Sequence, residues 1–320
     1  SLRLRLAIRV SMSAPDLARA EVAKAMDATA GGVLESADET VAVSTESGYK
    51  NPLGTVNEGW GEVFMGATME SVLVGYNDPR LIKYYSKAEG GDIKDEKGNL
   101  IIAERNKIAG TYKGVPQGTG VTVKDENRYR LHSKSTITKQ TDAILMTAAE
   151  VWFLRAEAAL RGFTSENVKD CYEKGITVSC QQWGVNVGDY LTSDATPSDY
   201  VDAFEAKYDV KALIKVTPKW DGGASPEEQL ERILTQQWIA CYPEGYEAWT
   251  EQRRTGYPQL FKVFVNNRGG AIDTNIRIRR LPYPSDIQKN NPTQYSALKK
   301  ALGGEDNGGT RLWWDTGRNF

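Results

Sequence analysis

The chain has 320 residues, of which 40% are hydrophobic and 26% are charged, and its formal net charge is -2. This length allows one large domain or two ordinary ones, each with a substantial buried core. The balanced charge gives no electrostatic reason to expect nucleic acid or an anionic membrane as the main partner, and no run approaches the roughly 20 apolar residues that span a bilayer.

The first thirty residues predict a pair of helices. The opening leucines alternate as in a strand, yet they also fit a helical stripe, and Leu and Arg are good helix formers. Pro15 and Asp16 are typical of a first helical turn, and Gly31 with Gly32 ends the second helix. We therefore expect a helix hairpin over residues 1–30.

Two later ranges repeat this pattern. In residues 142–183, large residues face small alanines across two antiparallel helices, which is the packing pattern of the tetratricopeptide repeat. Residues 226–255 follow Ser225 as a helix cap, with Glu228 at the capping-box position. The predicted fold class is therefore mainly α, with tetratricopeptide-like helix hairpins that support a loop-rich irregular region with a few short strands, in one domain over residues 1–320.

Long stretches between the hairpins are rich in Gly, Asn, Asp, Tyr and Trp. They hold short alternating runs and many turn signals, such as the hairpin turn expected at Lys97, Gly98 and Asn99. A loop content this large is unusual for a compact domain and points to function in the loops. The predicted loop-rich segments are 44–62, 86–128 and 256–320.

Several loop aromatics stand beside polar residues, a combination that suits sugar recognition. The apolar face of a pyranose stacks on an aromatic ring while polar neighbours hydrogen-bond to its hydroxyls. The alternative is that each ring is buried beneath its loop and fastens it. The candidate ligand-binding residues are Tyr49, Trp60, Tyr112, Trp220 and Trp313.

The sequence offers few groups for catalysis. His132 is the only histidine, and its alternating stretch RYRLHSKS favours a solvated strand histidine over a catalytic base. In YPEGYEAWTEQRRTGYP, the spacing of Glu247 and Glu251 to Arg254 favours helix-stabilising ion pairs over a pair of catalytic carboxylates. The acidic residues of GGDIKDEKGNL lack the spacing of a calcium loop. We therefore expect no catalytic residue, no metal site and no cofactor.

Segments spread in order over nearly the whole chain share one resemblance. They are AEVWFLRAEAALRG, QQWIACYPEGYEAWTEQRRTGYP, RIRRLPYPSDIQKNNPTQYSAL and LGGEDNGGTRLWWD, together with SLRLRLAIRV and VGYNDPRL. The first four resemble landmarks of the SusD/RagB family of Bacteroidetes, and the last two resemble landmarks of one large branch of it. The resemblance implies a nutrient-binding lipoprotein on the outer-membrane surface that is not an enzyme. Its partners would be an oligosaccharide or peptide ligand and a SusC-type TonB-dependent transporter, over which it acts as a hinged lid.

The resemblance also implies a part of the protein that has no counterpart here. The lipobox cysteine and the N-terminal half of a typical member are expected to be absent, so the lipid anchor would lie outside this chain. No binding residue of the family matches a motif here, and the candidates rest on loop aromatics. Three functions stay open: a binding protein for import without catalysis, a glycoside hydrolase, and a tetratricopeptide-like scaffold for protein interaction.

Overall fold

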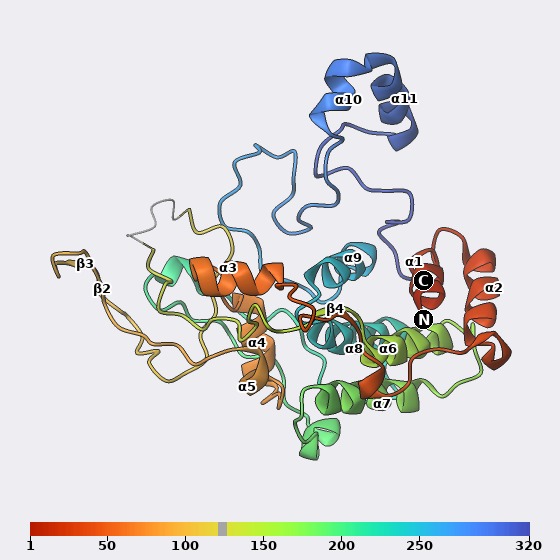
Figure 1. The fold of residues 1–320 in the computed structure, drawn as a ribbon, viewed down its shortest axis with the longest axis horizontal. Coiled ribbons are helices and arrows are strands. Elements are labelled where there is room, and N and C mark those ends of the chain that lie inside the picture. The colour runs from red at the N-terminus through yellow and green to blue at the C-terminus, as the bar shows by residue number, and fades with distance from the viewer. Residues whose placement is uncertain (121–126) are drawn as a thin grey trace.

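The computed structural model describes residues 1–120 and 127–320 of a mainly helical protein (Figure 1). The three predicted hairpin ranges contain the pairs α1 (Leu2–Arg9) and α2 (Pro15–Met26), α6 (Ala148–Leu160) and α7 (Val168–Gln182), and α8 (Pro226–Ala240) and α9 (Gly245–Thr255). The other helices are α3 (Pro52–Trp60), α4 (Ala67–Gly75), α5 (Leu81–Tyr84), α10 (Ser285–Asn290) and α11 (Pro292–Leu302). The short strands are β1 (Val41–Val43), β2 (Ile93–Lys94), β3 (Leu100–Ile102) and β4 (Ala143–Met146). The predicted fold class is confirmed.

Helix α6 lies at the centre of the helix stack. It contacts α7, α8 and α1, and nearly all of its residues are buried. Gly175, in the middle of α7, is explained by this packing, because a Cβ there would lie 2.8 Å from the Phe153 ring of α6. Glycine inside a helix costs about 1 kcal/mol relative to alanine, and the close approach of the aromatic ring offsets that cost with buried contact area.

The middle hairpin starts later than the predicted range 142–183. Its first residues form β4, which pairs antiparallel with β1. Helix α6 begins only after Thr147, whose Oγ1 accepts a hydrogen bond from the Glu150 N–H at 3.1 Å. This side chain satisfies one of the free N–H groups of the first helical turn and so sets the boundary.

Three helices lie in segments that were predicted to be loops. Helix α3 lies within 44–62, and α10 and α11 lie within 256–320, where they stand apart from the helix stack (Figure 1). Neither α10 nor α11 buries a residue, so neither packs into the core that the hairpin helices share. In 86–128, β2 and β3 form the expected hairpin around Gly98, while residues 121–126 lie outside the described residues.

The prediction of a solvated His132 is wrong. The residue is only 2% exposed and lies in a turn, with its ring centroid 5.1 Å from that of Tyr129 and 6.0 Å from that of Phe204. Burial and the nearby Lys113 ammonium lower the pKa of His132 to about 3. The imidazole is therefore neutral near pH 7, and the charges on both sides of it in the sequence misled the prediction.

The glutamates of α9 join helices together. Glu251 pairs with Arg254 at the predicted spacing, whereas Glu247 pairs with Arg9 of α1 instead. Arg254 also reaches Glu157 of α6, with an N–O distance of 2.6 Å. These carboxylates are thus held in ion pairs between three helices, which is a structural arrangement.

Two glycines of α3 provide a matched test of how this helix packs against the segment around Thr138. A Cβ on Gly54 would lie 2.1 Å from the backbone carbonyl of Thr138, whereas a Cβ on Gly59 would meet nothing within 4 Å. We expect Gly54→Ala to lower the free energy of unfolding by about 2 kcal/mol or more, and Gly59→Ala to raise it by about 0.5–1 kcal/mol through helix propensity. Urea unfolding measures both variants, and shifts of the same sign would contradict the packing of α3 against this segment.

Candidate functional site

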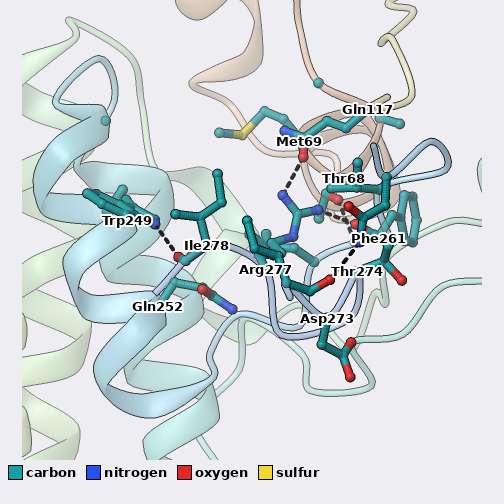
Figure 2. Close-up of a pocket in the computed structure, with 18 of the residues that line it drawn as sticks. Thr68, Met69, Gln117, Trp249, Gln252, Phe261, Asp273, Thr274, Arg277 and Ile278 are labelled. Carbon is teal, nitrogen blue, oxygen red and sulfur yellow. Dashed lines mark hydrogen bonds between the residues drawn. The ribbon is translucent and has the colours of Figure 1, made fainter. Parts of the chain in front are cut away.

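A cavity of about 590 Å³ lies between three parts of the chain (Figure 2). One wall is the start of α4, over residues 66–69, and a second is formed by α9 with Trp238 of α8. The third wall comes from the loop 260–278, which follows α9. The lining is predominantly apolar, with a small number of amide, hydroxyl and charged groups, which is the usual composition of a ligand pocket.

Helix α9 contributes one complete face to this cavity. Gly245, Ala248, Trp249 and Gln252 line it at the i, i+3, i+4, i+7 spacing of a helical stripe. The ion-paired glutamates lie on another face of the same helix. One short stretch of sequence therefore builds both the scaffold and the pocket wall.

The Trp249 indole is held on two sides. Its Nε1 donates a hydrogen bond to the Ile278 carbonyl at 3.1 Å (Figure 2), and the Arg253 guanidinium lies 3.6 Å from the ring centroid. A cation stacked on a tryptophan face is attracted by the ring quadrupole. Because both contacts fix the ring before a ligand arrives, stacking on it would cost little additional conformational entropy.

The outer loop is fastened to the rest of the pocket through its backbone. The Phe261 N–H donates to Thr68 Oγ1 at 3.0 Å, which joins the loop to the start of α4. The Val265 N–H donates to the Gly118 carbonyl at 2.8 Å. These bonds position the loop over the cavity.

The Gln252 side chain is a polar group available to a ligand. The residue is 5% exposed, and its amide makes no hydrogen bond to any residue that the structure describes. It extends from α9 toward the loop that carries Arg277 (Figure 2). The amide is therefore placed to hydrogen-bond to a ligand in the cavity.

Arg277 is the least exposed of the charged residues in the loop wall. Its guanidinium donates to the Phe261 carbonyl and to Gln117 Oε1 (Figure 2), both of which are neutral acceptors. Burial lowers the pKa of Arg277. The backbone φ of this residue is +65°, a left-handed conformation that costs roughly 1 kcal/mol or more for a residue other than glycine.

Aromatic rings beside amides and a guanidinium suit the recognition of a saccharide. The rings can stack on apolar sugar faces, and the polar groups can hydrogen-bond to hydroxyls. Hydrolysis of a glycosidic bond would need two carboxyl groups, whereas Asp273 is the one carboxylate among the lining residues in the described part of the chain. The same part contains no group of three or more His, Cys, Asp or Glu side chains that could hold a metal ion.

The five aromatics predicted from the sequence lie elsewhere. Tyr49, Trp60 and Trp313 are exposed, with Trp60 at 62% and Trp313 at 71%. Tyr112 and Trp220 are half-buried and pack against the main hydrophobic core. None of the five belongs to the lining of the cavity, and their part in ligand binding stays a prediction.

Sequence reasoning missed Trp249 and Gln252 as ligand-facing residues. The spacing of Glu247 and Glu251 to Arg254 points to the other face of this helix. A useful signal was nevertheless present, since Gly245, Ala248, Trp249 and Gln252 form a second stripe with two small residues. Small residues leave room beside a large ring, which is what a pocket on a helix face requires.

Comparison with known proteins assigns the chain to a family. The chain matches the SusD-like family, described as Susd and RagB outer membrane lipoprotein, over residues 1–315. No match was found among curated proteins. Among the described residues, no helix combines the length and the apolar character needed to cross a membrane.

Solved structures agree with this assignment. A SusD homologue from Bacteroides vulgatus has a TM-score of 0.90 at 51% identity, covering 100% of this chain and 62% of its own. A chitin-binding SusD homologue from Flavobacterium johnsoniae has a TM-score of 0.86 at 36% identity, with coverages of 99% and 62%. A SusD homologue from Bacteroides thetaiotaomicron has a TM-score of 0.85 at 33% identity, with coverages of 98% and 64%. This chain thus spans less than two thirds of the length of these relatives, and it belongs to the SusD-like family.

Proposed function

We propose that this chain is part of a cell-surface protein that binds a glycan, or in second place a peptide, for nutrient uptake and does not cleave it. The observation that carries the proposal is the cavity in which the fixed Trp249 indole faces the same space as the unpartnered Gln252 amide. Membership of a family of outer membrane lipoproteins supports the location, and a chitin-binding relative of 36% identity supports a saccharide ligand.

Delivery to a SusC-type TonB-dependent transporter is the second part of the proposal. A protein that passes on its ligand must release it, so we expect dissociation constants in the micromolar to millimolar range. A pocket with few aromatic and polar contact groups suits such a range, because these contacts must also offset the entropy lost on binding.

The first test is calorimetric titration of the protein with chito-, xylo- and malto-oligosaccharides. Trp249→Ala is expected to weaken binding of the preferred sugar about tenfold, since it removes the stacking surface. Gln252→Ala is a second pocket variant that leaves the indole in place, and it should also weaken binding. Trp313→Ala is the matched control, because it removes an exposed tryptophan outside the cavity. Circular dichroism and thermal melting establish that each variant is folded.

Two results would contradict the proposal. If Trp313→Ala or Trp60→Ala abolishes binding while both pocket variants bind normally, the ligand site lies on the exposed loop aromatics. If chromatography detects shortened sugars after incubation with the pure protein, the glycoside hydrolase alternative is correct. The proposed function would be supported if the sugars keep their length and the wild-type protein binds them more tightly than both pocket variants do.

A further inference from the structure

Arg277 is half-buried and, like the buried Arg253, has only neutral hydrogen-bond partners among the described residues, unlike three other arginines of this chain. Arg80 pairs with Asp78, Arg254 with Glu157 and Arg279 with Asp315, at N–O distances of 2.6 Å in each case. Arg277 instead donates to a backbone carbonyl and a glutamine amide, and it forms no ion pair with any described residue. Its Nε lies buried without a hydrogen-bond partner there. A partly desolvated cation in this situation lacks the anion that would normally compensate it.

The other charged residues that line the cavity do not supply that anion. The charged lining residues of the described chain are Arg268, Asp273 and Arg277, a formal sum of +1. Asp273 Oδ1 accepts the backbone N–H groups of Asn275 and Ile276 within its own turn, at 2.7 and 3.4 Å. Figure 2 shows the Asp273 carboxylate turned away from the Arg277 guanidinium.

The opposite wall adds positive potential. Residues 66–69, the start of α4, line the cavity, and the N-cap Gly66 provides no side-chain cap. The Ala67 N–H already donates to the Val115 carbonyl at 2.9 Å, and the N–H groups that follow in a first helical turn carry partial positive charge. Glu70 in the same turn is already occupied, because its carboxylate accepts from Lys113 Nζ at 2.6 Å and from the Gly114 N–H at 2.7 Å.

We propose that the ligand unit held in this cavity is anionic, a sugar bearing a carboxylate or a sulfate, with Arg277 as its principal charged contact. The unpartnered Gln252 amide donates a further hydrogen bond, and the Trp249 ring stacks on the sugar face. A guanidinium presents several N–H groups in one plane and matches the paired oxygens of both anions. This inference rests on the proposed glycan-binding function and specifies the charge of the ligand.

The test compares tetrasaccharides of similar size and different charge by calorimetric titration. Chitotetraose is the neutral probe, a hyaluronan tetrasaccharide carries carboxylates, and a carrageenan tetrasaccharide carries sulfates without carboxylates. We expect one of the acidic probes to bind at least about tenfold more tightly than chitotetraose. Whichever acidic probe binds more tightly identifies the anion as carboxylate or sulfate.

Variants assign that preference to Arg277. Arg277→Gln keeps a hydrogen-bonding amide but removes the charge, and it should lose about tenfold in affinity for the acidic probe while its affinity for chitotetraose is unchanged. Arg277→Lys keeps the charge and should retain part of the preference. Arg3→Gln is the matched control, because it removes a positive charge from the exposed Arg3 of α1. If Arg3→Gln loses as much affinity for the acidic probe as Arg277→Gln does, the net charge of the protein attracts the ligand and the cavity does not. This result would overturn the inference.

A second measurement separates this inference from the proposed function. Glucuronate, a single acidic sugar, is titrated while the Nε–Hε signal of Arg277 is followed by NMR, with assignment from its loss in Arg277→Lys. A shift of this signal supports the anion site even if no oligosaccharide binds, in which case the proposed function alone fails. Equal binding of neutral and acidic probes, with no effect of Arg277→Gln, overturns the inference and leaves the glycan-binding function standing. No binding of any probe and no NMR shift overturn both.

Discussion

Arg80→Leu is expected to lower the free energy of unfolding by about 3–5 kcal/mol. Arg80 is 0% exposed and forms a bidentate pair with Asp78, with N–O distances of 2.9 and 2.6 Å. Its guanidinium also donates to Ser179 Oγ at 3.0 Å and to Gln236 Oε1 at 2.8 Å. The arginine thus connects α5, α7 and α8, and its removal leaves the Asp78 carboxylate buried with its charge uncompensated. Chemical unfolding followed by tryptophan fluorescence measures the change.

The control for Arg80 is an ion pair of similar length at the surface. Arg105 lies 2.7 Å from Asp209, and both side chains are 34% exposed. Arg105→Leu should cost no more than about 1 kcal/mol, because water solvates the charges in both states. Asp78→Asn removes the charge of the other member of the buried pair and should also destabilise the protein. An Arg80→Leu protein within 1 kcal/mol of wild type would show that this pair does not hold the helices together.

Arg254→Met is expected to destabilise the protein by about 3 kcal/mol at pH 7. Arg254 donates to both carboxylate oxygens of Glu157, at 2.7 and 2.6 Å, and also pairs with Glu251. Burial alone would raise the pKa of Glu157, but the Arg254 and Arg161 charges outweigh it and lower that pKa to about 2. Since Glu157 is completely buried, the variant would leave its carboxylate with one cation fewer and no exposure to solvent.

The pH dependence of this variant gives a sharper test. In wild type, the folded pKa of Glu157 lies below its unfolded value of about 4.3, so its stabilising contribution is complete above that value and is lost as the pH falls through about 2. Without Arg254 the folded pKa rises, and mild acid then protonates Glu157 and relieves the penalty. The stability difference between wild type and Arg254→Met should therefore shrink from pH 7 to pH 4. Lys169→Met removes an exposed partner of Glu173 and should show little difference at either pH. A constant difference across this range for Arg254→Met would contradict the role of the ion pair.

Local patterns predicted much of the helical scaffold. The capping box of Ser225 and Glu228 is present at the start of α8, with the Ser225 N–H donating to Glu228 Oε2 at 3.0 Å. Pro15 stands at the first position of α2. These signals work because helix caps and helix-starting prolines act through atoms three or four residues away in sequence. The same range of interaction gave the pairing of Glu251 with Arg254.

Local patterns failed where burial depended on distant parts of the chain. His132 stands among charged residues in the sequence, yet Phe204, more than seventy positions away, packs against it. Tyr112 and Trp220 have polar neighbours and still pack against the core. Burial is a property of the assembled helices, so neighbours in sequence do not decide it.

The sequence by itself determined the fold class and the three helix-pair ranges, including the one that contains α9, because helical periodicity and capping are short-range properties. The tertiary structure alone decided the candidate site, since it joins residues 66–69, Gln117, α9 and Arg277, and Gly66 and Arg277 are 211 positions apart. It also decided that Arg277 would lack a carboxylate partner among the described residues. The cost of burying a charge depends on every group packed around it, and that arrangement exists only once the helices and the loop 260–278 have come together.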